Sequence, residues 1–582
     1  MFTIPSKTDK VFYQPNKGDT FGSIYSSKNA DTISNIGRLR ATRSFKVETS
    51  ATLTDVVNAI AYFNFDNSGG QDVVIGNDQG VWTSLTPVQT FTLDVTSGTP
   101  TDVTDLEVFN NNIYAATSST TVKYKAKTGN WLTLTSGLTS GTTHMLQQYG
   151  DRLYVTDGNK VFSSNTSNVF VTTGSYTLDL SVFYGDIAFI KASSNRLWIG
   201  LNKNDGTKAM IFEWDGQSEN LWSKNYLTEA SKLATCVIKD DIPYVLDSEG
   251  RLLAFNGSGF QEVSRLIHKT NTYYVSHYNG ATAFNDSIML NVNGGIYQYN
   301  KDSGIMHYTS PSLSPISGSI VDYGSLYDYG TIGYGAIMDI SDFPNLTGDY
   351  FGDLLYGSRM LDSAGNISYV LCADIGINNT SKAMAGYITT PMLESNNVED
   401  VWKATVIKYK KLLNTSDKII TKYKTSIIEP FIYSGTWVNS TQFTAIVAGG
   451  GPFLFDYISV GYEVEILTGN GSGQVTHITN ISNVGSTYTI TLKDSIVGVS
   501  AGNESVMKYD NWIELPSITK SEVQFSNIPL MALNKNVQMQ FKIYYELTNL
   551  FVLQSLFTGE GNINVNELYE IMVVNDTEQH AK

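Results

Sequence analysis

The sequence predicts an all-β protein: a degenerate β-propeller of six to seven blades, followed by a β-sandwich that carries an inserted small β-barrel. Three observations lead to this prediction. The chain has 35 Tyr and 49 Gly in 582 residues, a composition typical of half-buried strands joined by tight turns. A strand-and-turn pattern recurs through the first two thirds of the chain. Alternating apolar and polar strands follow in the last third.

The length and the charge limit the kind of protein. A chain of 582 residues is too long for one hydrophobic core, so two to four domains are expected. Apolar residues make up 41% and charged residues only 16%, which is typical of a folded chain. The formal net charge of −16 argues against a protein that grips nucleic acid through its phosphates.

The first 50 residues differ in charge from the rest. Residues 1–46 contain eight Lys and Arg but only three Asp, so this segment is positive while the remainder is strongly negative. We expect residues 1–50 to form an extended basic arm, which is either solvated or docked on an acidic neighbour.

The two cysteines and the first residues of the chain indicate the compartment in which it is expected. Cys236 and Cys372 are too few for a disulfide framework and lack metal-ligand spacing. The opening MFTIPSKTDK has no apolar signal core, and no apolar run of 18 residues occurs. We therefore expect cytoplasmic synthesis, no export signal and no membrane segment.

The propeller is predicted over residues 51–385. A polar turn followed by two or three apolar residues recurs, as in Asn-Asn-Ile-Tyr at 111–114 and Asn-Arg-Leu-Trp at 195–198. The anchors of this repeat are Val74, Tyr114, Tyr154, Trp198, Tyr244 and Met289. Their successive spacings of 40, 40, 44, 46 and 45 residues fit four-stranded blades. A further blade is predicted between Leu354 and Leu371, and a solenoid is the competing architecture.

The last third is predicted to form two domains. Residues 386–430 and 508–582 are assigned to the β-sandwich, with 401–409 and 418–424 as two strands around a turn at 414–416. Residues 537–545 alternate apolar and polar side chains, as a half-buried strand does. Residues 431–507 are assigned to the inserted barrel, because their three or four strands must close or pack to be stable.

One segment of the sequence is a candidate metal site. Asn64, Asp66, Ser68 and Asp72 offer oxygen atoms at alternating positions of a tight loop, as calcium requires. A plain turn is the alternative reading, since Asn and Asp also bond their own backbone. No other cofactor is expected.

Catalytic motifs are absent from the sequence. There is no His-Glu-x-x-His pair and no Gly-x-Ser-x-Gly elbow. A propeller glycosidase needs acidic residues that face one another across the axis, and sequence spacing does not reveal these. We therefore expect a protein that is not an enzyme.

The layout resembles virion proteins of tailed bacteriophages, above all nozzle or tail-tube-end proteins of short-tailed phages. Residues 388–393, which lead into 402–409 and 418–424, resemble the passage from propeller to sandwich in such proteins. The likeness is architectural and covers about 40 residues of junction, without a diagnostic motif.

The resemblance implies a structural role in the virion tail, after synthesis in the host cytoplasm. It implies a cyclic ring of identical copies that guides DNA exit and anchors neighbouring tail proteins, on the adaptor or portal side and at the fibres. DNA would then pass the lumen only in transit. The alternatives are a receptor-binding propeller that recognises host-surface glycans and, third, a glycan-cleaving enzyme.

Overall fold

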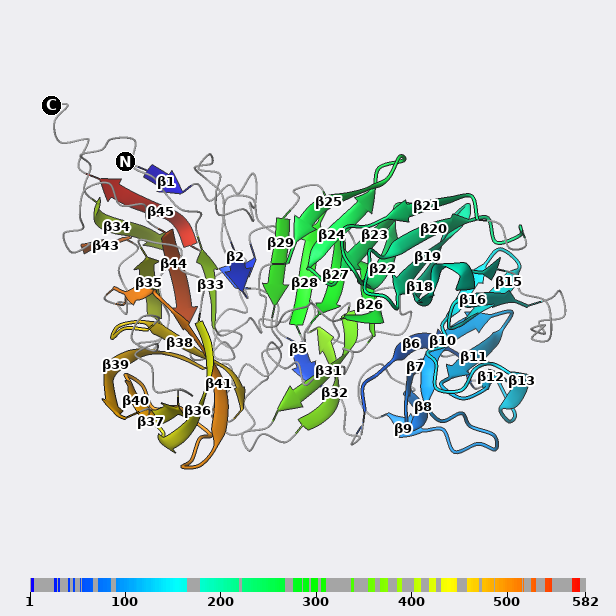
Figure 1. The fold of residues 1–582 in the computed structure, drawn as a ribbon, viewed down its shortest axis with the longest axis horizontal. Helices are drawn as coiled ribbons and strands as arrows, with labels where there is room; N and C mark the ends of the chain where they lie inside the picture. The colour runs from blue at the N-terminus through cyan, green and yellow to red at the C-terminus, as the bar shows by residue number, and fades with distance from the viewer. Residues whose placement is uncertain are drawn as a thin grey trace, which may run out of the picture.

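The computed structural model is all-β over the residues that it describes (Figure 1). These are residues 2–4, 26–28, 30–31, 40–41, 45–47, 53, 55–65, 72–84, 91–164, 178–218, 222–266, 276–284, 286–292, 295–301, 305–309, 336–339, 354–361, 367–374, 385–389, 402–409, 418–424, 431–446, 458–469, 471, 474–485, 487–515, 517, 525–529, 540–546 and 568–575. Within these ranges the helical content is a single 3-10 turn, η1 (Ser181–Phe183). None of the described segments forms a helix that is long and apolar enough to cross a membrane.

The first two thirds of the chain form a seven-bladed propeller. Five blades are separate four-stranded antiparallel sheets in chain order. Blade one comprises β6 (Ala59–Phe63), β7 (Asp72–Asn77), β8 (Gly80–Ser84) and β9 (Thr92–Leu93), and blade two comprises β10 (Val103–Phe109), β11 (Asn112–Thr117), β12 (Thr121–Ala126) and β13 (Leu132–Ser136). Blade three comprises β14 (Leu146–Tyr149), β15 (Arg152–Asp157), β16 (Lys160–Ser163) and β17 (Leu178–Asp179), and blade four comprises β18 (Gly185–Ser193), β19 (Arg196–Lys203), β20 (Met210–Trp214) and β21 (Lys224–Leu227). Blade five comprises β22 (Leu233–Lys239), β23 (Ile242–Asp247), β24 (Arg251–Phe255) and β25 (Phe260–Arg265).

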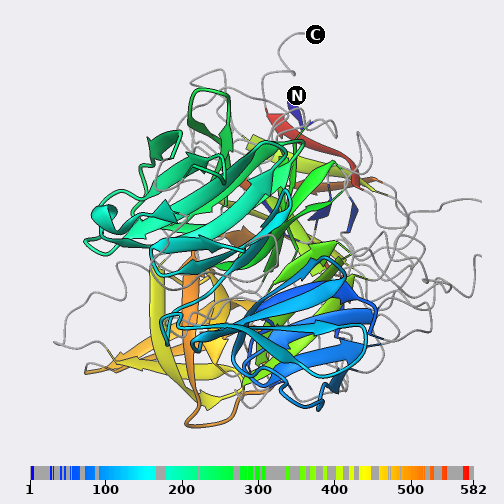
Figure 2. The same ribbon diagram turned by 90° about the vertical axis from the view of Figure 1, so that its right-hand side faces the viewer.

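Blades six and seven complete the ring. Blade six comprises β26 (Ser276–Phe284), β27 (Ser287–Val292), β28 (Gly295–Asn300) and β29 (Ile305–Thr309). Blade seven comprises β30 (Ile337–Asp339), β31 (Leu354–Leu361), β32 (Ile367–Asp374) and, from the N-terminal segment, β5 (Phe45–Val47). Each innermost strand contacts the next one around the ring, and β30 contacts both β26 and β6, which closes it. Figure 1 shows the blade sheets on the right of the view, and Figure 2 shows the molecule from that side.

The repeat seen in the sequence is the second strand of each blade. Its six anchors lie in β7, β11, β15, β19, β23 and β27, and all are at most 5% exposed. These strands are covered on both faces, because apolar clusters form between neighbouring blades as well as within them. The seventh blade appears at β31 and β32, where the sequence predicted it, so the propeller prediction is confirmed.

The C-terminal third forms two sheets, which we call the sandwich region. One sheet has the order β1 (Phe2–Ile4), β45 (Leu568–Asn575), β34 (Trp402–Tyr409), β43 (Phe525–Pro529). The other is part of a nine-stranded sheet that begins with blade six and continues through β2 (Ser26–Lys28), β33 (Ala385–Thr389), β44 (Gln540–Glu546), β35 (Lys418–Lys424) and β42 (Ile513–Glu514).

The expected pairing of residues 401–409 with 418–424 is wrong. These strands, β34 and β35, lie in different sheets: β34 pairs with β43 and β45, whereas β35 pairs with β42 and β44. Adjacent strands in a sequence suggest a hairpin, but here each strand finds partners more than 80 residues away in the chain.

The inserted barrel is a closed six-stranded sheet. Its order is β36 (Phe431–Asn439), β37 (Gln442–Ile446), β40 (Thr487–Leu492), β39 (Val475–Val484), β38 (Glu463–Gly469), β41 (Glu504–Asp510). The chain leaves the sandwich region after β35 and returns at β42, which pairs with β35. Trp437, Phe443, Ile490 and Met507 are among the buried residues that fill the barrel.

Strands of the N-terminal 50 residues join three sheets formed by later strands, and two of them pair with each other in a fourth sheet. β1 pairs with β45, β5 pairs with β32, and β3 (Ala30–Asp31) pairs with β4 (Arg40–Ala41). β2 lies between β29, which it meets in parallel register at Tyr308, and β33, which it meets in antiparallel register at Ile388. The sequence predicted a separate, extended basic arm over residues 1–50. Its basic composition gave no sign of main-chain pairing with sheet edges, whose free N–H and C=O groups require partners.

The first prediction concerns β2. Replacing Ser27 by Pro removes a backbone donor and breaks the ladder between propeller and sandwich region, at a cost of about 1–3 kcal/mol. We expect a lower melting temperature and a larger radius of gyration by X-ray scattering, with Ser27→Val as the control. Identical values for the two variants would contradict the role given to β2.

Candidate functional site

Polar side chains from three different blades meet at the propeller axis. They are Asp105 and Glu107 on β10, Lys191 on β18, and His277 and Asn279 on β26. We call these five residues the axial cluster. Blades two, four and six supply them, so their interactions cross the centre of the ring.

A bulge brings the β26 residues into the cluster. The ladder between β26 and β27 breaks between Ser276 and Ala281, which leaves residues 277–280 outside the regular pairing. Gly280 allows this compact turn of the backbone, because a Cβ there would lie 2.8 Å from the carbonyl oxygen of His277. Bulges re-aim side chains and are frequent near functional sites.

Asp105 is the best-connected member of the axial cluster. Its Oδ1 accepts hydrogen bonds from the Leu106 backbone (2.9 Å) and from Asn279 Nδ2 (2.8 Å). Its Oδ2 accepts one from the Leu146 backbone (2.8 Å) in the next blade. Burial raises the pKa of Asp105 to about 6, and Lys191 together with these donors limits the rise.

Lys191 and Asn279 extend the network across the axis. Lys191 Nζ donates to Asn279 Oδ1 (2.9 Å), and Asn279 Nδ2 also approaches the carbonyl oxygen of Asn58 (3.3 Å). Tyr278 donates its hydroxyl hydrogen bond to the carbonyl oxygen of Thr104 in blade two. Three non-adjacent blades and the entry to blade one are thus joined at the centre.

Glu107 and His277 are uncharged at neutral pH. Burial, and then the charge of Asp105, raises the pKa of Glu107 to about 8, against the opposing effect of Lys191. Burial and Lys191 lower the pKa of His277 to about 3. Asp105 is therefore the carboxyl group of the cluster that ionises most readily, and Lys191 is the nearby positive charge that limits the rise of its pKa.

The two carboxyl groups of the axial cluster lie on one strand and do not face each other across the axis. Asp105 and Glu107 are two residues apart on one strand, so both point to the same side of β10. Across the axis Asp105 meets Asn279 instead of a second carboxylate. Two acidic residues at alternate positions of β10 are the sequence signal for this cluster, and they match no catalytic motif.

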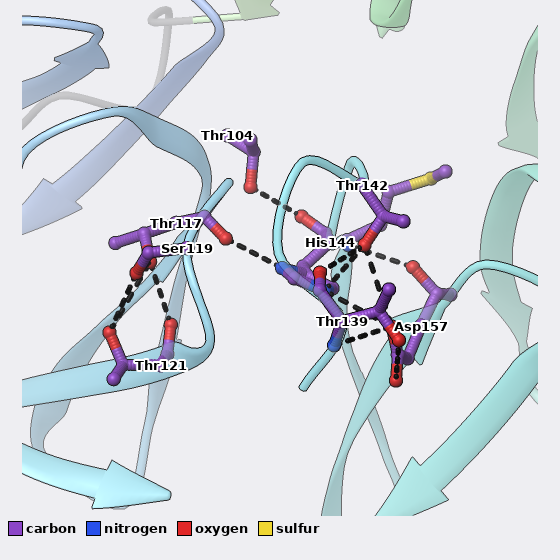
Figure 3. Close-up of polar contacts among 10 residues, drawn as sticks. Thr104, Thr117, Ser119, Thr121, Thr139, Thr142, His144 and Asp157 are labelled. Atoms are coloured by element: carbon purple, nitrogen blue, oxygen red, sulfur yellow. Dashed lines mark hydrogen bonds and ion pairs between the residues drawn. The ribbon is translucent and has the colours of Figure 1, made fainter. Parts of the chain in front are cut away.

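A second buried polar cluster joins blades two and three (Figure 3). His144 Nε2 lies 2.8 Å from Thr142 Oγ1 and 3.3 Å from Asp157 Oδ1, and its Nδ1 lies 2.6 Å from the Thr117 carbonyl oxygen. Burial alone would raise the pKa of Asp157, but hydrogen bonds from His144 and Thr139 hold it below its ordinary value.

This His144 cluster has the residue types of a catalytic triad but not its geometry. In a triad the hydroxyl and the carboxylate contact opposite nitrogens of the imidazole. Here both contact Nε2, and a backbone carbonyl group occupies Nδ1. Asn77 and Asp247 end the second strand of their blades as Asp157 does, and their side chains bond the backbone of the following turn. The cluster therefore fixes turns and joins blades.

The calcium candidate is only partly covered by the structure. Asp66 and Ser68 lie outside the described residues. Asp72 is buried, and its Oδ2 accepts a hydrogen bond from the Phe65 backbone (3.3 Å). Within the described part of the chain, no three His, Cys, Asp or Glu side chains are grouped to hold a metal ion. Calcium binding by Asn64, Asp66, Ser68 and Asp72 stays a prediction.

Comparison with known proteins gives distant structural likenesses. No protein-family model and no curated protein matches the chain. The computationally designed protein Ika8 aligns with a TM-score of 0.34 and 12% identity, over 56% of this chain and 99% of that one. The WD40 domain of Neurospora crassa Pan2 aligns with a TM-score of 0.37 and 10% identity, over 57% of this chain and 96% of that one.

The second prediction concerns Glu107. Because its pKa is higher in the folded chain, the folded state holds a proton that the unfolded state loses between pH 4.5 and about 8. The free energy of unfolding therefore falls as pH rises through this window. Glu107→Gln keeps the neutral form, so its melting temperature should match the wild type at pH 5 and exceed it by about 2 °C or more at pH 8.5.

The control for this measurement is Glu504→Gln, which changes an exposed carboxyl on the barrel. It should leave the melting temperature unchanged at both pH values. If Glu107→Gln changed the melting temperature equally at pH 5 and pH 8.5, the account would be contradicted. The folded state would then not keep Glu107 protonated above its ordinary pKa.

Proposed function

We propose that the chain is a structural component of a phage tail, namely a subunit of a nozzle or hub ring that guides DNA exit and anchors neighbouring tail proteins. The observation that carries the proposal is the N-terminal segment, which enters three separate sheets and joins the propeller to the sandwich region. Such cross-pairing suits a subunit that transmits force, because separation of the domains requires the breaking of backbone ladders.

The charge of the chain is compatible with DNA in transit. A net charge of −16 repels phosphates, so a ring of such subunits lets DNA pass without holding it. Copies with identical surfaces close into a ring by a heterologous, cyclic contact. The neighbouring tail proteins on the portal side and at the fibres belong to the same proposal.

A receptor-binding propeller is the second candidate, and one observation favours it. Tyr184, directly after η1, is 77% exposed, and Val182 is 66% exposed. They lie where the chain enters blade four, on a loop that is supported by Phe183 packed against Phe212 and Trp222. Exposed aromatic rings stack on sugars, whereas the repeat tyrosines and Trp198 are buried in the blades.

The third prediction separates these functions by electron microscopy of the purified chain and of the particle that contains it. A ring subunit should form closed rings on the tail axis. Single copies at fibre tips, together with glycan binding by the isolated chain, would contradict the ring proposal. In that case Tyr184→Ala should abolish glycan binding, while Leu132→Ala, at an exposed residue of the outer strand β13, should retain it.

A further inference from the structure

The base of the barrel presents an acidic pair to the sandwich region. Glu463 on β38 and Asp510 on β41 are direct partners in the barrel ladder. Both are buried, at 3% and 9% exposed. Two carboxylates that lie directly opposite each other repel, so this end of the barrel needs positive charge nearby.

The sandwich region presents a matching basic set. Lys422 on β35 and Lys542 on β44 are direct partners in their sheet, and Lys424 lies two residues further along β35 on the same face. All three lysines are at most 7% exposed. Each surface thus carries like charges, and the opposite charges of the other surface offset their repulsion.

Five residues form the centre of this contact, and we call them the latch: Lys422, Lys424, Glu463, Asp510 and Lys542. Glu463 bridges the lysine pair, with Oε1 2.7 Å from Lys542 Nζ and Oε2 2.5 Å from Lys422 Nζ. Lys424 Nζ lies 3.3 Å from Asp510 Oδ1. Burial alone would raise the pKa of Glu463, but the two lysines hold it well below its ordinary range.

The ring of Trp512 packs against two lysines of the latch. Lys424 Nζ lies 4.5 Å and Lys542 Nζ 5.7 Å from its centroid, both within cation–π distance. Trp512 follows directly after the barrel, where the chain returns to the sandwich region. The charged contact and the point of re-entry therefore coincide.

The hydrophobic core of the barrel is separate from this contact. Every buried residue of its core cluster lies between Trp437 and Tyr509, within the barrel itself. Among the described residues, the contacts between barrel and sandwich region are made by charged side chains and by the ring of Trp512. At the edge of this contact, Glu514 on β42 lies 2.8 Å from Lys493 Nζ and 3.3 Å from His477 Nδ1 of the barrel. Polar domain interfaces of this kind permit relative motion of the domains.

We propose that the barrel is a docked module that separates from the sandwich region without unfolding, and that the latch holds it docked. The latch works through complementarity, because loss of the Glu463 charge removes the carboxylate that both buried lysines contact. Glu463 is the positioning residue, since its two carboxylate oxygens contact the two members of the lysine pair. Release of the barrel would expose the basic face of the sandwich sheet.

The test measures docking by single-molecule energy transfer in the full chain. Dyes are attached to cysteines introduced at Val484, which is 85% exposed on the barrel, and at Ser258, in an exposed propeller turn, with Cys372 replaced by Ser. Glu463→Gln should add a low-transfer population and raise the undocked fraction about tenfold or more, with the circular dichroism unchanged. The matched control is Glu465→Gln, on the same strand, whose partner Lys508 belongs to the barrel.

A triple variant distinguishes the loss of charge balance from misfolding. Replacing Lys422, Glu463 and Lys542 together by Met removes all three central charges and should restore the single high-transfer population, since apolar groups of similar length replace buried ion pairs well. The proposal is overturned if Glu463→Gln keeps the wild-type distribution. It is also overturned if this variant unfolds barrel and sandwich region in one transition.

Discussion

The strand β2 is the constraint on which the arrangement of the domains depends. Three residues of the N-terminal segment lie between the last strand of blade six and the first strand of the sandwich region, and they turn two sheets into one of nine strands. Without β2, the edges of β29 and β33 would each present unpaired backbone groups. The same segment supplies the outer strand of blade seven and the edge strand β1, so the N-terminus stabilises sheets formed mainly by residues beyond position 300.

Buried charge fixes geometry at two further places. In the axial cluster, Lys191 and Asp105 both contact Asn279 and tie blades two, four and six across the centre. In the latch, Glu463 contacts Lys422 and Lys542 and so joins the barrel to the sandwich region. Such groups add little net stability, but they penalise every arrangement in which a partner is missing. Both clusters thus select one relative position of elements that apolar contacts alone would hold less specifically.

The sequence predicted those features that repeat or alternate locally. The anchors from Val74 to Met289 marked the second strand of six blades, and 537–545 marked β44, because a buried strand imposes a pattern on its own residues. Pairing between distant segments leaves no such pattern, so the partners of β34, β35 and the N-terminal strands were missed. The axial cluster joins five residues that are spread over some 170 positions, and only a bulge in β26 brings two of them in. The calcium loop and the role in a phage tail stay predictions.

Native-state hydrogen exchange on a shortened chain tests the central claim most directly. A chain that begins at residue 32 lacks β1 and β2 but keeps β5 for blade seven. If β2 joins the propeller to the sandwich region, amides of 305–309 and 385–389 should lose protection in the shortened chain. Amides of the inner blade strands, such as 187–190, should stay protected. Unchanged protection at 305–309 and 385–389 would contradict the account, because β2 would then not be what holds the two sheets together.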